Sequence, residues 1–406
     1  MPAETVRVID IPAACDGAHA HVVADPRARK SVLSGVTELD TALSINGSLA
    51  AKDERIRAGF IGCGSHSFRN IYPTFQFAGV NLIATCDLNP DKAAAYAQLF
   101  GAERSYTDYR EMLEKERLDA VFIVTNYDTD ATPRFMRLAQ QCMKAGVHVW
   151  TEKPPSASVR EVEETIEVSQ ATGKFVLVGF KKCFFPAIEK AWQITRKPEF
   201  GEISTVYARY PQYIPSDEEK RDRSCGAVVS FLDHLVHPMS ILNYIAGKVH
   251  TLYHERSPNG GGFATLRFTS GATGVIHFVH GVSGTSPLER LEVVGHGANV
   301  VVDNGIKLTY YRPGGRGPGG YGVAANYIGP DEGAPIYWEP EFSLGQLYNK
   351  GLFLLGYYGE IKHFADCVRT NTPPTKCGLD DALEITKVYE AFMQREGQVV
   401  EVNSEQ

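Results

Sequence analysis

The sequence of 406 residues predicts an α/β fold with an N-terminal doubly wound parallel sheet and a C-terminal α+β domain built on a large, mostly antiparallel sheet. Strand and helix signals alternate from residue 55 to about residue 180, which indicates parallel strands joined by crossover helices. Beyond residue 180, β-rich segments follow one another between glycine turns. The length also suits two cores better than one.

Five apolar segments in the first half predict buried parallel strands. They are IRAGFIG (56–62), VNLIATCD (80–87), DAVFIVT (119–125), VHVWT (147–151) and FVLVGF (175–180). The segments between them have helical patterns, at 68–79, 90–101, 108–116, 132–146 and 158–173. Alternating strands and helices imply right-handed crossovers.

The second half predicts antiparallel strands within 203–214, 260–269, 271–281, 288–296 and 298–303, with one helix at about 229–245. Residues 312–336 are glycine-rich and predict a long loop, and two closing helices are expected at 357–369 and 380–393. The expected organisation is an arm (1–52), a dinucleotide-binding domain (53–178), a substrate and oligomerisation domain (179–350), and C-terminal helices (351–406) that pack back near the cofactor domain.

Composition excludes several classes of partner. The net charge of −7 lacks the basic footprint of a nucleic-acid binder. None of the eight cysteines forms a CxxC pair, which argues against zinc or a redox dithiol and favours a reducing cytoplasm. No leader pattern and no run of 18 apolar residues are present, so we expect no membrane association.

A glycine loop, GFIGCGSHS, follows the first predicted strand. Gly62 permits a tight turn, Gly64 lets the backbone approach a pyrophosphate, and Ser67 stands in place of the third glycine of GxGxxG. Ser65 and His66 complete the loop. Asp87, at the end of the second strand, is placed to accept both hydroxyls of an adenosine ribose, and the neighbouring Leu88 adds no cation. The pattern predicts a Rossmann domain that binds NAD rather than NADP.

The segment HVWTEKPPS (148–156) places two charges at the mouth of a buried strand. Glu152 and Lys153 follow the strand directly, and Pro154 and Pro155 stop it. Ligands of open α/β sheets bind outside the carboxyl ends of the strands, so we expect both charges to face a ligand.

Together, GCGSHS, the spacing to Asp87, AGVHVWTEKP, GFKKCFFPA and LDHLVHPMSILNYIAG resemble the Gfo/Idh/MocA oxidoreductases, the group of glucose-fructose oxidoreductase and inositol dehydrogenase. The resemblance covers about residues 55 to 395. It implies that Lys153 contacts the reacting hydroxyl and the nicotinamide, with Glu152 orienting it or offsetting its charge. It also implies a homodimer or homotetramer, as does a sheet with one open face.

The family's second catalytic element, DxxxHxxD, matches Asp233 and His237, which lie on one helical face. An alcohol must lose a proton as hydride leaves its carbon, and histidine, with a pKa near 6.5, suits the base. Counting from residues 225–226 instead makes His234 the base and puts His237 in the place of the acid. A metal site is a further alternative for the two histidines, although no third ligand of suitable spacing appears.

Several positions depart from the family pattern. Ser240 replaces the last acid of DxxxHxxD, and Cys183 stands where many members have arginine. Lys181 and Lys182 precede it and are either exposed charges at a strand end or candidates to receive an anionic or hydroxyl-rich group. Tyr210, Tyr213 and Trp338 are candidates for a sugar platform, although aromatic residues in strands are more often part of the core. Thr125 and Asn126 occupy the family's TPNxxH position without its histidine.

The sequence thus predicts an NAD-dependent enzyme that oxidises a secondary hydroxyl of a sugar, glycoside or cyclitol, with Lys153, His237 and Asp233 at the reaction centre. One alternative is a glycosidase that retains NAD and oxidises the sugar transiently. A non-catalytic nucleotide-binding scaffold is a third interpretation.

Overall fold

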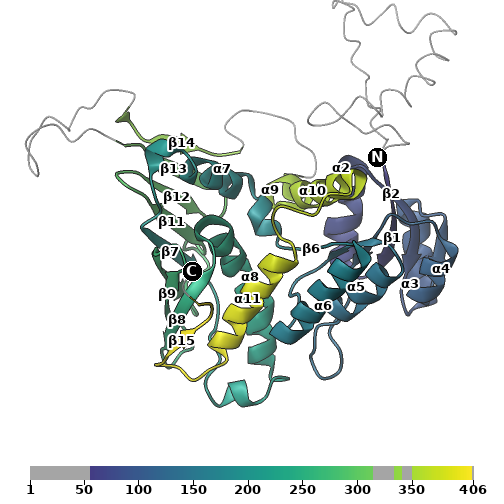
Figure 1. Cartoon of the computed structure of the whole chain (residues 1–406), viewed down its shortest axis with the longest axis horizontal. Helices are drawn as coiled ribbons and strands as arrows, with labels where there is room; N and C mark the ends of the chain where they lie inside the picture. The colour runs from purple at the N-terminus through teal and green to yellow at the C-terminus, as the bar shows by residue number, and fades with distance from the viewer. Residues whose placement is uncertain (1–54, 314–332, 341–349, 405–406) are drawn as a thin grey trace, which may run out of the picture. The chain divides into compact units, whose positions relative to one another are not determined.

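The computed structural model describes residues 55–313, 333–340 and 350–404 (Figure 1). The expected arm at 1–52 lies outside the described residues, as does most of the loop expected at 312–336. The described residues belong to one compact unit that starts at Glu54. Within the described residues, no helix is long and apolar enough to cross a membrane.

The first sheet is parallel throughout, as predicted. Its strands are β1 (Ile56–Ile61), β2 (Val80–Cys86), β3 (Arg104–Tyr106), β4 (Ala120–Ile123), β5 (His148–Thr151) and β6 (Val176–Val178). Their order, β3-β2-β1-β4-β5-β6, is that of a dinucleotide-binding sheet. The sequence did not predict β3, because its three residues are partly or fully exposed and have no apolar pattern.

The crossover helices are α3 (Pro90–Phe100), α4 (Tyr109–Lys115), α5 (Phe135–Lys144) and α6 (Val159–Thr172), close to their predicted bounds. The helix expected at 68–79 is wrong as one element. It consists of a π-helical turn (Ser67–Ile71), a 3-10 turn (Tyr72–Thr74) and the short α2 (Phe75–Ala78). Pro73 has no backbone N–H to donate and disfavours a continuous helix through this segment.

The second sheet has nine described strands in the order β14-β13-β12-β11-β7-β10-β9-β8-β15. Their bounds are β7 (Thr205–Tyr210), β8 (Val249–Arg256), β9 (Gly262–Phe268), β10 (Thr273–Phe278), β11 (Arg290–Val294), β12 (Asn299–Asp303), β13 (Lys307–Tyr311), β14 (Ile336–Trp338) and β15 (Val399–Glu401). All described pairs are antiparallel except β7 with β10. The sequence did not predict β8, β13, β14 and β15.

Helices α7 (Pro186–Thr195) and α8 (Gly226–Ala246) pack against this sheet, and α7 was not predicted. The closing helices are α10 (Tyr357–Thr370), which follows the short α9 (Lys350–Leu354), and α11 (Leu379–Phe392). Helix α10 packs on α2, and α11 packs on both α6 and α8. The C-terminal helices therefore contact elements of both halves of the chain. The domain boundaries stated above remain predictions.

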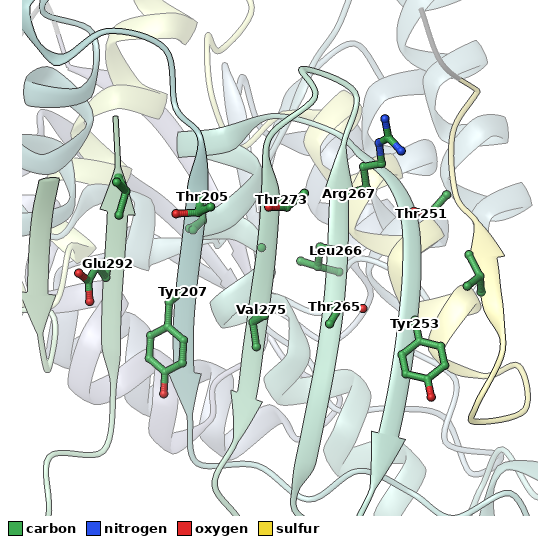
Figure 2. A pocket seen from close by; sticks show the side chains of 14 residues that line it. Thr205, Tyr207, Thr251, Tyr253, Thr265, Leu266, Arg267, Thr273, Val275 and Glu292 are labelled. Atoms are coloured by element: carbon green, nitrogen blue, oxygen red, sulfur yellow. The ribbon is translucent and has the colours of Figure 1, made fainter. Parts of the chain in front are cut away.

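The other face of the second sheet carries no helix among the described residues. Register places Glu292, Tyr207, Val275, Thr265 and Tyr253 in one row across five strands. Figure 2 shows these side chains on neighbouring strands, where they line a broad hollow of about 690 Å³. Because the hollow lies on the sheet and not beside the glycine loop, it is not the place where a dinucleotide would bind.

Candidate active site

The glycine loop turns sharply at the end of β1. Gly62 has a φ of 106°, and a Cβ there would lie 1.8 Å from the carbonyl oxygen of Val124. Its backbone N–H donates to the carbonyl of Cys86 at 2.8 Å. At Gly64 no atom lies within 4 Å of a Cβ position, so the backbone is open to an approaching group. Position 62 thus requires glycine for the turn, and position 64 leaves room for a phosphate.

Asp87 is fixed against this loop by two backbone hydrogen bonds. Its Oδ2 accepts from the N–H of Cys63 at 2.8 Å, and its Oδ1 accepts from the N–H of Asn89 at 2.9 Å. Each carboxylate oxygen keeps a second lone pair for another donor. The glycine loop and Asp87 therefore fit the pyrophosphate and ribose of a dinucleotide.

The other predicted cofactor residues differ in exposure. Ser67 is buried, and its hydroxyl donates to the carbonyl of Gly62 at 2.9 Å, so it holds the loop rather than facing a ligand. Ser65, Leu88 and Asn126 are exposed. The Thr125 hydroxyl is buried and has no hydrogen-bond partner among the described residues, which leaves it available to a ligand.

Glu152 connects the glycine loop to the segment after β5. Its Oε1 lies 2.7 Å from Nε2 of His66, and its Oε2 accepts from the backbone N–H of Lys153 at 3.1 Å. The amide of Asn70 lies 3.1 Å from Nδ1 of His66. Since Asn70 Nδ2 can only donate there, Nδ1 of His66 accepts and Nε2 donates to Glu152. The Lys153–Pro154 peptide bond is cis.

Lys153 and Asp233, 80 residues apart in the sequence, form the central contact of the site. The Lys153 Nζ donates to Oδ2 of Asp233 at 2.9 Å and lies 3.3 Å from its carbonyl oxygen. The two side chains are 20% and 28% exposed, so a small molecule can reach them. Tyr127 donates its hydroxyl to Oδ1 of Asp233 at 2.9 Å. The carboxylate is thereby held at both oxygens.

The two histidines of α8 both follow Asp233 in the sequence and differ in burial. His237 is buried 6.2 Å from the ring of Tyr210, measured between ring centroids. Burial, reinforced by Lys182, Lys153 and Lys181, holds the pKa of His237 well below its usual value, so the ring is neutral at pH 7. His234 is half exposed, and its Nδ1 lies 2.8 Å from the Ser230 carbonyl.

The remaining predicted substrate residues, Lys181, Lys182 and Tyr213, differ in their hydrogen-bond partners. Lys182 is buried, is paired with Glu289 and lies 4.7 Å from the centroid of the Tyr210 ring. Lys181 donates to the hydroxyl of Tyr357 at 2.7 Å.

Tyr213 is engaged elsewhere, because its hydroxyl bonds to Glu219 at 3.0 Å and to Arg256 at 3.1 Å. No described contact joins Tyr213 to Lys153, Asp233 or His237, so its proposed role remains a prediction.

Glu360, on the first turn of α10, is a carboxyl group buried without a hydrogen-bond partner among the described residues. It is 1% exposed. Burial and the charge of Glu152 raise its pKa well above the usual value, against the opposing effect of Lys181. Burial therefore favours the protonated form of Glu360.

Sequence reasoning missed Tyr127, Tyr357 and Glu360 as neighbours of the site. Tyr127 follows the end of β4 at the same sheet edge as Lys153, so its position in the sequence offered a signal. Tyr357 and Glu360 lie some 200 residues after β5. No pattern in the sequence of α10 indicates that Tyr357 contacts Lys181. Among the described residues, no group of three or more His, Cys, Asp or Glu side chains could hold a metal ion.

A parallel sheet of this order, with a glycine loop after its first strand and an acid at the end of its second, is the arrangement of a dinucleotide-binding domain. Two family models match: the NAD-binding Rossmann fold of the Gfo/Idh/MocA oxidoreductase family at residues 56–180, and the Gfo/Idh/MocA C-terminal domain at 188–301. Together they cover more than half of the chain, which belongs to the Gfo/Idh/MocA family.

Individual relatives are distant. The chain is 25% identical to a myo-inositol 2-dehydrogenase of Thermotoga maritima, over 83% of this chain and 95% of the relative. It is 29% identical to a glycosyl hydrolase family 109 protein of a Shewanella species, over 46% of this chain and 42% of the relative. A levoglucosan dehydrogenase solved with NADH and levoglucosan superposes with a TM-score of 0.69 at 16% identity, over 86% of this chain and the whole of that one.

We predict that Asp87→Ala weakens NAD binding about 10- to 100-fold and NADP binding much less. The change removes two ribose hydrogen bonds, but it also removes the repulsion of a 2′-phosphate. Fluorescence titrations with both cofactors measure the difference, and Asp91→Ala, on the exposed first turn of α3, is the matched control. Equal losses for NAD and NADP would separate Asp87 from the ribose.

A second prediction concerns Glu360 and pH. In the unfolded chain this carboxyl ionises near pH 4.3, whereas burial keeps it protonated in the folded chain at higher pH. The folded state therefore binds the extra proton, and the stability it provides is lost as pH rises above the unfolded pKa. Glu360→Gln should reduce this loss, so that its melting temperature exceeds that of the wild type increasingly between pH 5 and pH 8. The exposed Glu163→Gln is the control, and parallel curves for Glu360→Gln and wild type would contradict the assignment.

Proposed function

We propose that the protein oxidises a secondary hydroxyl of a sugar, glycoside or cyclitol with NAD as hydride acceptor. The contact between Lys153 and Asp233 carries this proposal, since it joins the strand end beside the glycine loop to the helix that bears His237. The dehydrogenase relatives support this substrate class, because inositol is a cyclitol and levoglucosan is a sugar derivative.

In the proposed mechanism, bound NAD supplies the acceptor for the hydride, and the protein's own side chains manage the proton. The Lys153 amine binds the oxygen of the reacting hydroxyl. Asp233 orients that amine, and Tyr127 keeps the carboxylate from rotating. His237, neutral because of its burial, accepts the hydroxyl proton. Donors fixed before the substrate arrives need little reorganisation during the reaction.

The second candidate is a glycosidase that oxidises its sugar transiently and retains the reduced cofactor until the hydride returns. The 29% identity to a glycosyl hydrolase family 109 protein supports this second candidate. The match spans less than half of that relative, so the full-length dehydrogenase relatives weigh more. A panel of sugars and glycosides, read simultaneously for NADH formation and glycoside cleavage, distinguishes the two activities.

The proposal predicts that His237→Asn lowers turnover by roughly 10²- to 10⁴-fold, the usual effect of losing a general base. NAD affinity should survive, because the glycine loop lies on another element. Steady-state kinetics and a cofactor titration measure the two quantities, with His234→Asn as the matched variant on the same helix.

Loss of activity in His234→Asn with full activity in His237→Asn would move the base to His234. Full activity in both would remove α8 from the chemistry. A dehydrogenase accumulates NADH in proportion to oxidised product. A transient-oxidation enzyme instead turns over many substrates per bound NAD and returns a deuterium from the oxidised carbon to the product.

The proposed quaternary structure is a homodimer or a dimer of dimers formed through the open face of the second sheet. Tyr207, Val275 and Tyr253 present aromatic and aliphatic surface there without a covering helix among the described residues. Their residue types suit the centre of an interface.

Val275→Arg should therefore shift light scattering from oligomer towards monomer, because it places an unpaired charge on the face. Ile306→Arg, outside the face on an exposed hairpin turn, should leave the oligomer intact. A wild-type chain that scatters as a monomer would defeat this proposal.

A further inference from the structure

Three lysines act electrostatically on the proposed base, and among the described residues two of them have a carboxylate partner. Lys153, Lys181 and Lys182 all act on His237 and oppose its protonation. Lys153 is paired with Asp233 at 2.9 Å, and Lys182 is paired with Glu289 at 2.5 Å. Those two ammonium charges are balanced within the protein.

Lys181 has no carboxylate within ion-pair distance among the described residues. Its Nζ donates to the Tyr357 hydroxyl at 2.7 Å and lies 4.4 Å from the centroid of that ring. An ammonium has three donors, and Tyr357 accepts one of them. Burial lowers the pKa of Lys181, as expected for an amine removed from water.

Glu152 and Glu360, the two carboxyl groups that act on Lys181, form no ion pair with it among the described residues. Both oxygens of Glu152 are engaged, one by His66 and the other by the backbone N–H of Lys153. Burial favours the protonated form of Glu360, and its two oxygens have no hydrogen-bond partner among the described residues. The ring of Tyr357 lies 5.9 Å from that of His66, which bonds to Glu152, so Lys181 is a cation near the proposed reaction centre without a carboxylate partner among the described residues.

Building on the proposed function, we infer that Lys181 and Tyr357 form an anion subsite and that the substrate is a polyol bearing a carboxylate, such as a uronic or aldonic acid. The substrate carboxylate would accept from the free donors of Lys181 while its hydroxyl meets Lys153. A phosphate fits less well, because its larger charge calls for several cations or an arginine fork, and the other two lysines are already paired.

The same anion would assist the proton transfer. When His237 takes the hydroxyl proton, a new positive charge appears among three lysines, which is unfavourable in a buried site. A carboxylate held at Lys181 offsets that charge. A neutral sugar offers no such compensation, so the subsite favours acid sugars in turnover as well as in binding.

The test compares matched pairs of substrates, glucose with glucuronate and gluconate, and galactose with galacturonate, on the NAD-loaded full chain. The wild type should favour the acids in kcat/KM by about 10-fold or more. Lys181→Met should lower kcat/KM for the acids about 10- to 100-fold and leave the neutral sugars within a few-fold. Lys181→Arg should retain much of the preference, and Lys190→Met, an exposed lysine on α7, should leave it unchanged.

Calorimetric titration of the same acids into the NAD-loaded protein gives a readout independent of turnover. Binding should weaken with added salt and be lost in Lys181→Met, and Tyr357→Phe should weaken it less. Equal effects of Lys181→Met on acid and neutral sugars, or a wild type with no acid preference, would overturn the subsite. Acid binding without NADH formation or glycoside cleavage would instead contradict the proposed function and leave the subsite standing.

Discussion

The site depends on one ion pair, Lys153 with Asp233, that joins two elements folded for unrelated reasons. Lys153 follows β5, whose four residues are all buried, so the strand end is fixed by the core of the parallel sheet. Asp233 lies on α8 between buried apolar residues such as Leu232 and Leu235. Because an unpaired charge in a partly buried site costs several kcal/mol, each group also stabilises the placement of the other.

This pair ends a continuous path of hydrogen bonds that starts in the glycine loop. His66 of the loop bonds to Glu152, which binds the backbone N–H of Lys153, and the Lys153 side chain then reaches Asp233. Tyr127 closes the path at the second oxygen of the carboxylate. The surface that fits a dinucleotide and the groups that would act on the substrate are therefore positioned together, which favours pre-organisation of the reactants.

The features of the fold and the site that depend on a local sequence pattern could be predicted from the sequence. Gly62, Asp87 and Lys153 each follow an apolar strand, and the carboxyl ends of parallel strands meet at one edge, so their proximity followed from strand order. The resemblance to DxxxHxxD and the spacing of four residues in a helix placed Asp233 and His237 on one helix face. Short, exposed β3 and the helix interrupted at Pro73 were misread, because they depend on neighbouring strands and on one missing backbone donor.

Contacts between distant segments were beyond prediction. The bonds from Tyr127 to Asp233, from Lys182 to Glu289 and from Lys181 to Tyr357 each span more than 100 residues. Which lysine finds a carboxylate depends on how the helices and the second sheet pack, and the adjacent lysines of GFKKCFFPA give no sign that one is paired and the other is not.

Glu360 links the stability of the fold to the charge of the site. Were this carboxyl group ionised, it would attract Lys181 and become the counter-ion that the amine lacks. Burial on α10 favours its protonated form, at a cost in folding stability that grows with pH. A buried polar group without a partner contradicts the ordinary rules of core packing, and such exceptions are expected where function requires them. In the proposed subsite, the buried Glu360 and Lys181, which has no carboxylate partner among the described residues, are thus two aspects of one arrangement, in which stability is reduced while a cation stays available to a ligand.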